Sequence, residues 1–362
     1  MPERRAGRVP AALAPAAAHP PLVDTEPGIP APVLAAAAGL RKAMLVPVVT
    51  ALTIGTVFVA VYLAAFHAPQ AHGQPLGIAA DDAVSARVES ELNTASPGSY
   101  TFYRYQDGEA ARQAVTHGKV PAALVTEGGE LRLITAGAQG PSTISGLATA
   151  VDSAVGHPVP RLDVRPLVAG DTRGLSAFYA AFGVVLAGFL FAVSSYQIAP
   201  RLPLIARVAS MAAFSAASGM AVALIAHSAM DALPAPLFTV ALLVGLLACA
   251  SAAAAGALLR LFGPIGMPIA SVVLLIFGNA TSGGILPATY LPAWLAPLAD
   301  VLAPAATIRG LRGAAYFHDA HLVGALLTLT AWIVGCLSLQ FALDRFAARR
   351  ACAAVTVAAA GR

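Results

Sequence analysis

The stretch LFTVALLVGLLACASAAAAGALL, from Leu237 to Leu259, decides the fold class of this chain. It contains no Asp, Glu, Lys or Arg, and it exceeds the ~20 apolar residues that a helix needs to cross the ~30 Å hydrocarbon core of a bilayer. A helix that is apolar on every side is either buried in a large core or surrounded by lipid. We therefore expect this stretch to be a transmembrane helix.

Five further apolar runs approach the same length, and the composition agrees with them. The chain is 58% hydrophobic and 11% charged, with a mean hydropathy of +0.74, whereas soluble domains carry about 25% charged residues. Pro264 and Pro268 lie at the start of the fifth run, which is short, and they predict a kink or a break there. The sequence thus predicts an α-helical polytopic membrane protein with six transmembrane helices. The further runs are Val46 to Phe66, Phe178 to Tyr196, Val208 to Ala226, Ile265 to Ala280 and Leu322 to Phe341.

The arginines near the helix ends predict the orientation, because such residues stay on the cytoplasmic side of a membrane. If both termini are cytoplasmic, basic residues exceed acidic ones inside and acidic residues exceed basic ones outside. Lysine occurs only at Lys42 and Lys119 in an alanine-rich chain that is also rich in arginine, as in proteins of GC-rich bacterial genomes. We expect a multi-pass protein of the bacterial plasma membrane with both termini in the cytoplasm.

The gaps between the runs predict the domain organisation. Residues 68–176 interrupt the hydropathy pattern with many charged residues, so one helix precedes this domain and five follow it. The first ~38 residues are rich in Ala and Pro and bury too little apolar surface to offset the entropy of ordering. The expected parts are a disordered cytoplasmic tail and pre-membrane segment at 1–42, the first transmembrane helix at 43–67, an extracytoplasmic α/β domain at 68–176, a five-helix bundle at 177–347 with a re-entrant segment at 279–312, and a cytoplasmic tail at 348–362.

Alternating and helical patterns within residues 68–176 predict the order β-α-β-α-β-β-α-β. Asp81 with Asp82 and, further on, Asp107 are expected to cap two of the helices. The sequence Glu127-Gly128-Gly129-Glu130 between two apolar strands predicts a hairpin. The last strand is expected at Leu162 to Val168.

No catalytic, cofactor or metal site is expected. The only Gly-Lys pair, Gly118-Lys119, lacks the rest of a phosphate-binding loop. The histidine pairs His67 with His72 and His318 with His321 lack cysteine or paired carboxylate partners, so we interpret them as polar residues at the membrane interface. No charge lies within the six runs, which disfavours ion-coupled transport, and the dispersed arginines disfavour nucleic-acid binding. The chain is therefore not expected to be an enzyme.

Two stretches resemble the permease subunits of the ABC-2-type transporter family, in particular its phage-infection-protein-like branch. The first is Asp171-Thr172-Arg173-Gly174-Leu175 followed by Phe178-Tyr179. The second runs from Asn279-Ala280-Thr281-Ser282-Gly283-Gly284-Ile285-Leu286-Pro287 through Leu291-Pro292 and Ala303-Pro304 to Ile308-Arg309-Gly310-Leu311-Arg312. Glu109 to Val115, with Gly118 and Ala122 to Val125, also resembles the helix and strand of the extracytoplasmic domain in that branch.

The resemblance implies a homo- or heterodimeric permease that exports a lipidic, polysaccharide or drug-like substrate. A separate ABC ATPase subunit would supply the energy, and the expected partners are that ATPase and membrane lipids. The alternative is a non-transporting membrane scaffold or receptor that binds an envelope or secretion partner through its extracytoplasmic domain. Neither reading needs a cofactor.

Residues 279–312 are expected to fold back into the outer half of the bundle, because their prolines prevent one long helix and their apolar residues are unsuited to a solvated loop. Arg309 and Arg312 would share one helical face and meet anionic lipid headgroups, an anionic substrate or Asp300. The alternative is an interfacial hairpin with snorkelling arginines. The candidate translocation residues are Asn279, Ser282, Gly283, Gly284, Pro287, Pro292, Arg309 and Arg312.

Two cytoplasmic features are candidates for contact with the ATPase. They are the segment from Val33 to Lys42 and the loop from Ile198 to Arg207, in which Arg201 and Arg207 would meet the partner. The alternative reading is a plain interfacial helix and a loop that only obeys the positive-inside rule.

Overall fold

The computed structural model describes residues 31–360, and it describes side chains from Ala43 to Arg350. Five helical segments in this part are long and apolar enough to cross a membrane, so the chain has the architecture of a multi-pass membrane protein. The segments are Ala43–Phe66, Ser176–Ile198, Leu204–Ala229, Leu237–Ala280 and Leu322–Arg350. They belong to the helices α1 (Ala31–Phe66), α5 (Ser176–Ile198), α6 (Leu204–Ala223, continued as a π-helix over Leu224–Ala229), α7 (Leu237–Phe262) with its continuation, and α12 (Leu322–Ala360).

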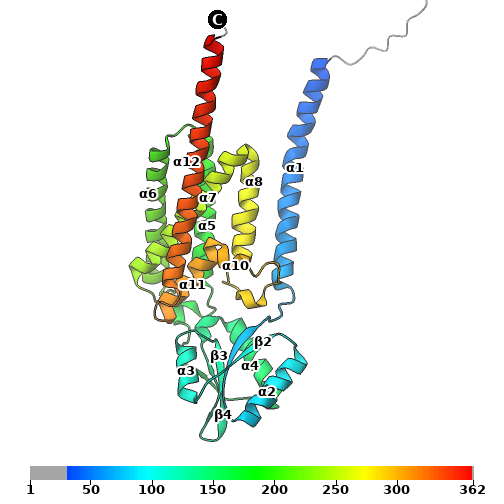
Figure 1. The fold of residues 1–362 in the computed structure, drawn as a ribbon, viewed down its shortest axis with the longest axis vertical. Coiled ribbons are helices and arrows are strands. Elements are labelled where there is room, and N and C mark those ends of the chain that lie inside the picture. The colour runs from blue at the N-terminus through cyan, green and yellow to red at the C-terminus, as the bar shows by residue number, and fades with distance from the viewer. Residues whose placement is uncertain (1–30, 361–362) are drawn as a thin grey trace, which may run out of the picture. The chain divides into compact units, whose positions relative to one another are not determined.

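The fourth segment has 44 residues and joins two of the runs that the sequence separates. The chain reverses at Gly263, whose φ of +62° is open to glycine but strained for other residues. Beyond this turn, α8 contacts α7, and Figure 1 shows the two helices side by side. The pieces after the turn are a 3-10 helix at Gly263–Ile265, α8 (Gly266–Ala270), a π-helix at Ser271–Phe277 and α9 (Gly278–Ala280).

One expectation about the chain ends needs correction. Part of the expected disordered tail is helical, because α1 begins at Ala31; residues 1–30 lie outside the described residues. At the other end, α12 continues to Ala360 and includes most of the expected tail at 348–362. Both extensions are rich in alanine, the residue with the highest helix propensity.

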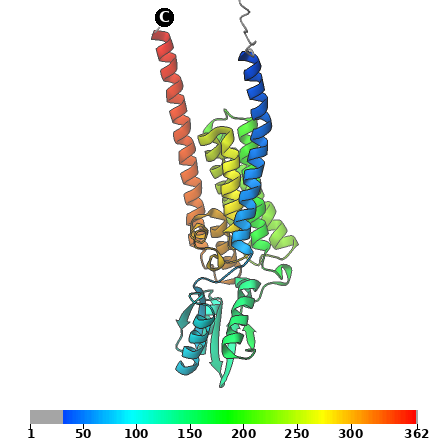
Figure 2. The same cartoon turned by 90° about the vertical axis from the view of Figure 1, so that its right-hand side faces the viewer.

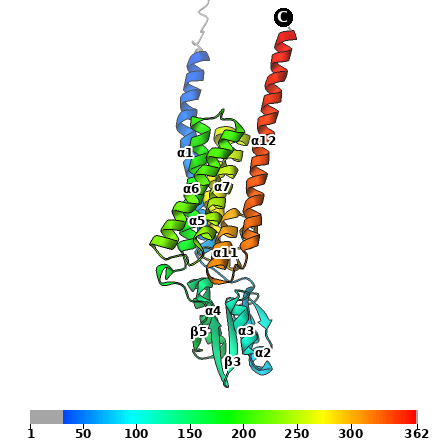
Figure 3. The same ribbon diagram turned by 90° about the vertical axis from the view of Figure 1, so that its left-hand side faces the viewer.

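Helix α7 is the centre of the bundle. It contacts α5, α6, α12 and α11 (Ala303–Tyr316), and Figure 3 shows α5, α6 and α7 packed next to one another. Small residues permit this close approach, as in many membrane bundles. A Cβ atom added to Gly219 of α6 would lie 2.9 Å from the Cα atom of Gly245 in α7, and one added to Gly188 of α5 would lie 2.9 Å from the Cβ atom of Ser251.

Replacing Gly219 by alanine is expected to destabilise the bundle by about 1–3 kcal/mol. The new methyl group would overlap backbone atoms of α7. The apparent melting temperature of the detergent-solubilised protein measures the effect. Gly183→Ala is the matched control, since a Cβ atom added there meets nothing within 4 Å. Equal melting temperatures for the two variants would show that α6 and α7 do not pack through Gly219.

A small α/β domain lies between α1 and α5 in the sequence, and its element order is the one predicted. Its sheet has the order β2-β1-β3-β4-β5. All neighbouring strands are parallel except β3 and β4, which form the predicted hairpin at Glu127–Glu130. The elements are β1 (Gln74–Ala79), α2 (Asp82–Ala95), β2 (Tyr100–Arg104), α3 (Gly108–Thr116), β3 (Ala122–Glu127), β4 (Glu130–Thr135), α4 (Pro141–Val155) and β5 (Arg161–Asp163).

Helices cover both faces of the sheet, because successive side chains of a strand point to opposite faces. Leu124 of β3 joins the core with α2 and α4, whereas its neighbour Val125 joins the core with α3. Figure 1 shows α3 on one side of the sheet and α2 with α4 on the other. Phe317, from outside the domain, completes the core on the side of α3.

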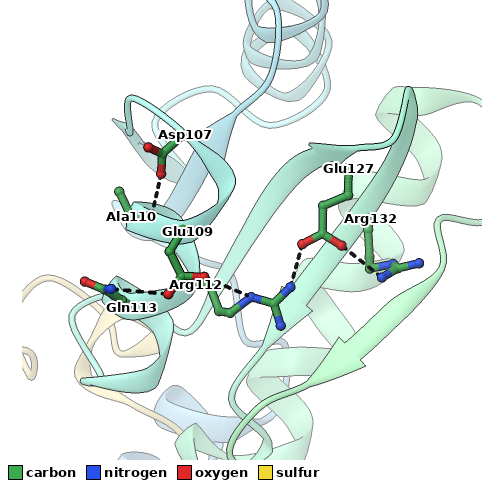
Figure 4. A network of polar contacts seen from close by, with 7 residues as sticks. All are labelled: Asp107, Glu109, Ala110, Arg112, Gln113, Glu127 and Arg132. Atoms are coloured by element: carbon green, nitrogen blue, oxygen red, sulfur yellow. Dashed lines mark hydrogen bonds and ion pairs between the residues drawn. The ribbon is translucent and has the colours of Figure 1, made fainter.

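Local details of the domain agree with the sequence at some positions and differ at others. Asp107 caps α3 by accepting a hydrogen bond from the Ala110 amide at 2.7 Å. Asp81 occupies the position before α2 but makes no capping bond, so the cap expected there is wrong. β5 ends at Asp163 rather than Val168, and the Asp163 carboxylate accepts a hydrogen bond from the Gly137 amide at 3.0 Å. Figure 4 shows the ion pairs that Glu127 makes with Arg112 and Arg132, which tie α3 to the hairpin.

Candidate functional site

The segment from Thr281 to Leu302 lies against the bundle and the domain. It is irregular apart from a 3-10 turn at Ala288–Tyr290 and the short helix α10 (Leu298–Val301). Prolines interrupt it as the sequence indicates, while Leu291 and Leu295 are fully buried. Figure 2 shows the segment between the membrane-length helices and the domain.

Apolar contacts fix the position of this segment on its bundle side. Leu291, Leu295 and Ala299 form a core with Val61 and Ala65 of α1 and with Ile276. On the domain side, the His72 amide donates a hydrogen bond to the Thr289 carbonyl at 2.7 Å, and Thr289 contacts Gln74. The segment therefore contacts α1 on one side and the start of the domain on the other, and both are far from it in the sequence.

Arg312 of α11 joins the stretches that carry the family resemblance. Its guanidinium donates to the carbonyl of Gly283 at 2.9 Å and to that of Gly284 at 3.1 Å. A longer bond of 3.4 Å reaches the carbonyl of Gly174. One half-buried side chain thus binds both the glycine turn after α9 (Gly283 and Gly284) and the segment that precedes α5.

The Arg312 guanidinium is partly withdrawn from water and lies near one carboxylate. Burial lowers the pKa of the Arg312 guanidinium, and the Asp171 carboxylate opposes that shift. Asp171 itself accepts hydrogen bonds from the Leu175 amide at 3.0 Å and the Ser176 amide at 3.2 Å, so it caps the start of α5. The guanidinium stays charged, because arginine does not lose its proton in proteins.

Gly284 allows the turn to touch α5. A Cβ atom added to Gly284 would lie 2.6 Å from the Cβ atom of Phe178, so no larger residue fits without displacing the helix or the turn. Gly283 has a φ of +73°. The Ser282 hydroxyl accepts a hydrogen bond from the Gly284 amide at 3.3 Å.

The remaining candidate residues have distinct surroundings. Arg309 donates to the Ala299 carbonyl at 2.7 Å and lies 3.7 Å from the Asp300 carboxylate, which was one of its expected partners. Asn279 is buried and donates to the Leu275 carbonyl at 2.9 Å, while its side-chain oxygen has no partner. Pro287 and Pro292 lie on either side of the 3-10 turn and are partly buried.

A cavity of about 200 Å³ lies where the glycine turn, α11 and the domain meet. It is smaller than the ~300–1,000 Å³ typical of sites for drug-sized ligands. The guanidinium groups and hydroxyls in its wall suit an anionic or hydroxyl-bearing group. No cluster of His, Cys, Asp and Glu suited to a metal occurs among residues 43–350, whose side chains the structure describes. The lining includes Thr281, Ser282, Gly283, Arg309 and Arg312, together with Gly118 and Gln139 of the domain.

The loop between α11 and α12 connects this cavity to the domain, and sequence reasoning did not identify it. His318, Asp319 and His321 all have positive φ, which is costly for residues with a side chain. Phe317 is buried in the domain core and contacts Gly118, while Arg165 contacts His318. The sequence offers one signal, the pair of glycines at 310 and 313 that lets α11 approach its neighbours closely.

The two arginines expected to contact an ATPase differ in their surroundings. Arg201 is exposed in the turn between α5 and α6. Arg207 is mostly buried, and it donates to the Leu202 carbonyl at 2.6 Å and contacts Asp344 at 3.4 Å. Only Arg201 is therefore free to meet a partner in this conformation.

Comparisons with known proteins give no relative for this chain. No family model, curated protein or solved structure matches it.

Proposed function

We propose that the chain is the permease subunit of an ABC-2-type exporter, in which a separate ATPase drives the release of a lipidic, polysaccharide or drug-like substrate. The observation that carries the proposal is the contact of Arg312 with Gly283, Gly284 and Gly174. It brings the two stretches that resemble this family into one buried site beside a cavity. The site matters more than the fold here, because one fold can carry many functions.

The proposed topology has six crossings, one before the domain and five after it. Contacts at the two ends of the bundle support it. The domain meets the 279–312 segment and the turn at Asp231 at one end, as Gly170 lies against the Asp231 carbonyl. Arg207, Arg260 and Asp344 meet at the other end. Alternating crossings would put the two sets on opposite sides of the membrane, and the arginines of the second set favour the cytoplasm for that side.

Thiol labelling in intact cells tests this topology. Cys352 is expected to resist a membrane-impermeant reagent, whereas a cysteine introduced at Gly128, in the domain hairpin, is expected to react. Substitution at Gly128 is sterically open, since a Cβ atom there meets nothing within 4 Å. Labelling of Cys352 together with protection of the introduced cysteine would reverse the proposed orientation.

The geometry suggests how substrate release is coupled to motion of the bundle. α11 contacts both α5 and α7, and its Arg312 donates hydrogen bonds to the carbonyls of the glycine turn. The loop after α11 inserts Phe317 into the domain core. A rotation of α11 would therefore reshape the cavity and shift the domain together, because both are attached to the same helix.

Affinity purification from native membranes tests the proposal. Full-length tagged chain should co-purify with a protein that carries nucleotide-binding motifs, identified by mass spectrometry. Its repeated absence, with an envelope protein recovered instead, would refute the permease function and favour the scaffold or receptor reading. A tagged, unrelated membrane protein expressed at the same level is the control for non-specific recovery.

A further inference from the structure

A second cavity, of about 420 Å³, lies at the end of the bundle that carries Arg207, Arg260 and Asp344. Four arginines and one acid contribute to its wall, so its charge is strongly positive. The basic side chains come from four places along the chain: the α5–α6 turn, the start of α6, the end of α7 and the second half of α12. They are Arg201, Arg207, Arg260 and Arg345, and the acid is Asp344.

The inner part of this cavity contains more positive than negative charge. Asp344 is paired with both Arg207 and Arg260, and the side chains of these two arginines are only 13% and 16% exposed. Arg207 also donates to Gln340 at 3.3 Å, but a neutral amide does not balance a charge. Two mostly buried guanidinium groups therefore share one carboxylate, which favours a further anion.

The outer part of the cavity has guanidinium groups that are available to such an anion. Arg201 and Arg345 are exposed, and neither forms an ion pair among residues 43–350. Arg345 stacks over the Phe341 ring, with 4.9 Å from its Cζ atom to the ring centroid. This stacking orients the side chain without using its hydrogen-bond donors.

The side chains around the cavity place it at the edge of the hydrocarbon layer. Ile198 and Ile205 are 84% and 85% exposed, and Phe346 is 60% exposed. Side chains this apolar are favourable in contact with lipid rather than water. The wall also contains Leu202 and Leu204. Basic pockets between membrane helices at this level bind anionic headgroups.

We propose that this cavity binds the phosphate of an anionic phospholipid, with Arg201 and Arg345 as its direct ligands. The excess charge of Arg207 and Arg260 attracts the phosphate, and the exposed isoleucines and phenylalanine contact the acyl chains. A phosphatidylcholine is a poor ligand because its headgroup is neutral overall. The site is separate from the cavity beside Arg312, and a phosphate bound to Arg201 would compete with the ATPase contact expected at that residue.

Native mass spectrometry of the full-length protein in a neutral detergent tests the proposal. The probes are dioctanoyl phosphatidylglycerol, dioctanoyl phosphatidylcholine and inorganic phosphate, each titrated separately. The variant Arg201→Gln/Arg345→Gln removes the two direct ligands and leaves the inner ion pairs intact. The matched control, Arg349→Gln/Arg350→Gln, makes the same change of charge on exposed residues of α12 outside the cavity wall.

We expect saturable binding of phosphatidylglycerol that is about tenfold weaker in the cavity variant and unchanged in the control. Equal weakening in both variants, or equal binding of phosphatidylcholine, would overturn the site. Binding of inorganic phosphate with the same dependence on Arg201 and Arg345, without a preference for the lipid, would overturn a lipid as the ligand. Loss of a co-purified ATPase with unchanged lipid binding would instead assign these arginines to protein docking.

Discussion

Replacing Arg312 by alanine is expected to abolish export and to destabilise the protein by about 3 kcal/mol. The change removes donors to three backbone carbonyls, two of them in the glycine turn and one before α5. The buried carbonyls would lose charge-assisted hydrogen bonds, and the turn would separate from the start of α5. The apparent melting temperature in detergent and the abundance in membranes measure the effect.

Arg173→Ala is the matched control for this variant. It removes the same charge two residues after Asp171, but Arg173 is exposed. Its melting temperature should equal that of the wild type. An Arg312→Ala protein as stable and active as Arg173→Ala would show that the glycine turn holds its place without the guanidinium. The conservative Arg312→Lys variant should keep part of the stability, because lysine keeps the charge but cannot reach three carbonyls with a planar fork.

Replacing Asp344 by asparagine is expected to destabilise the bundle by about 1–3 kcal/mol, because it leaves Arg207 and Arg260 close together without their carboxylate. Asp344 is 32% exposed, so solvent screening keeps the cost below that of a fully buried pair. Adding Arg260→Gln to Asp344→Asn should recover part of the loss. Melting temperatures of the single and double variants in a mutant cycle measure the coupling.

The contrary outcome is that the free-energy changes of the two single variants add up in the double variant. If Asp344→Asn and Arg260→Gln act independently, the ion pair contributes nothing and the arginines do not share the carboxylate. High salt is expected to reduce the cost of Asp344→Asn only modestly, since mostly buried pairs are screened less than exposed ones.

The sequence predicts the small domain well because its signals are local. Strand alternation, the glycine hairpin at 127–130 and the cap at Asp107 each depend on a few neighbouring residues. The last strand is shorter than predicted, and the hydrogen bond that the Gly137 amide donates to Asp163 at its end is long-range, so no local pattern indicates it. Hydropathy locates the apolar helices but not their ends, because alanine-rich helices continue beyond the apolar stretch, as α12 does.

The candidate site is only partly predictable. The residues of the glycine turn and of α11 are recognisable along the chain, and Asp300 is correctly expected as a partner of Arg309. Arg312 and Gly174, which the hydrogen bond joins, are 138 residues apart in the sequence, so no local pattern reveals the bond. The same holds for the cluster of Arg207, Arg260 and Asp344, which comes from three different helices.

If the proposed partner ATPase acts through this chain, the complex purified through a tag on the chain should hydrolyse ATP. Hydrolysis should be well above that of a mock purification. It should change when Gly284→Ala displaces the glycine turn from Phe178, and not when Gly335→Ala adds a methyl group that meets nothing within 4 Å. Full recovery of the chain with hydrolysis no higher than in the mock sample would show that the purified chain has no partner ATPase.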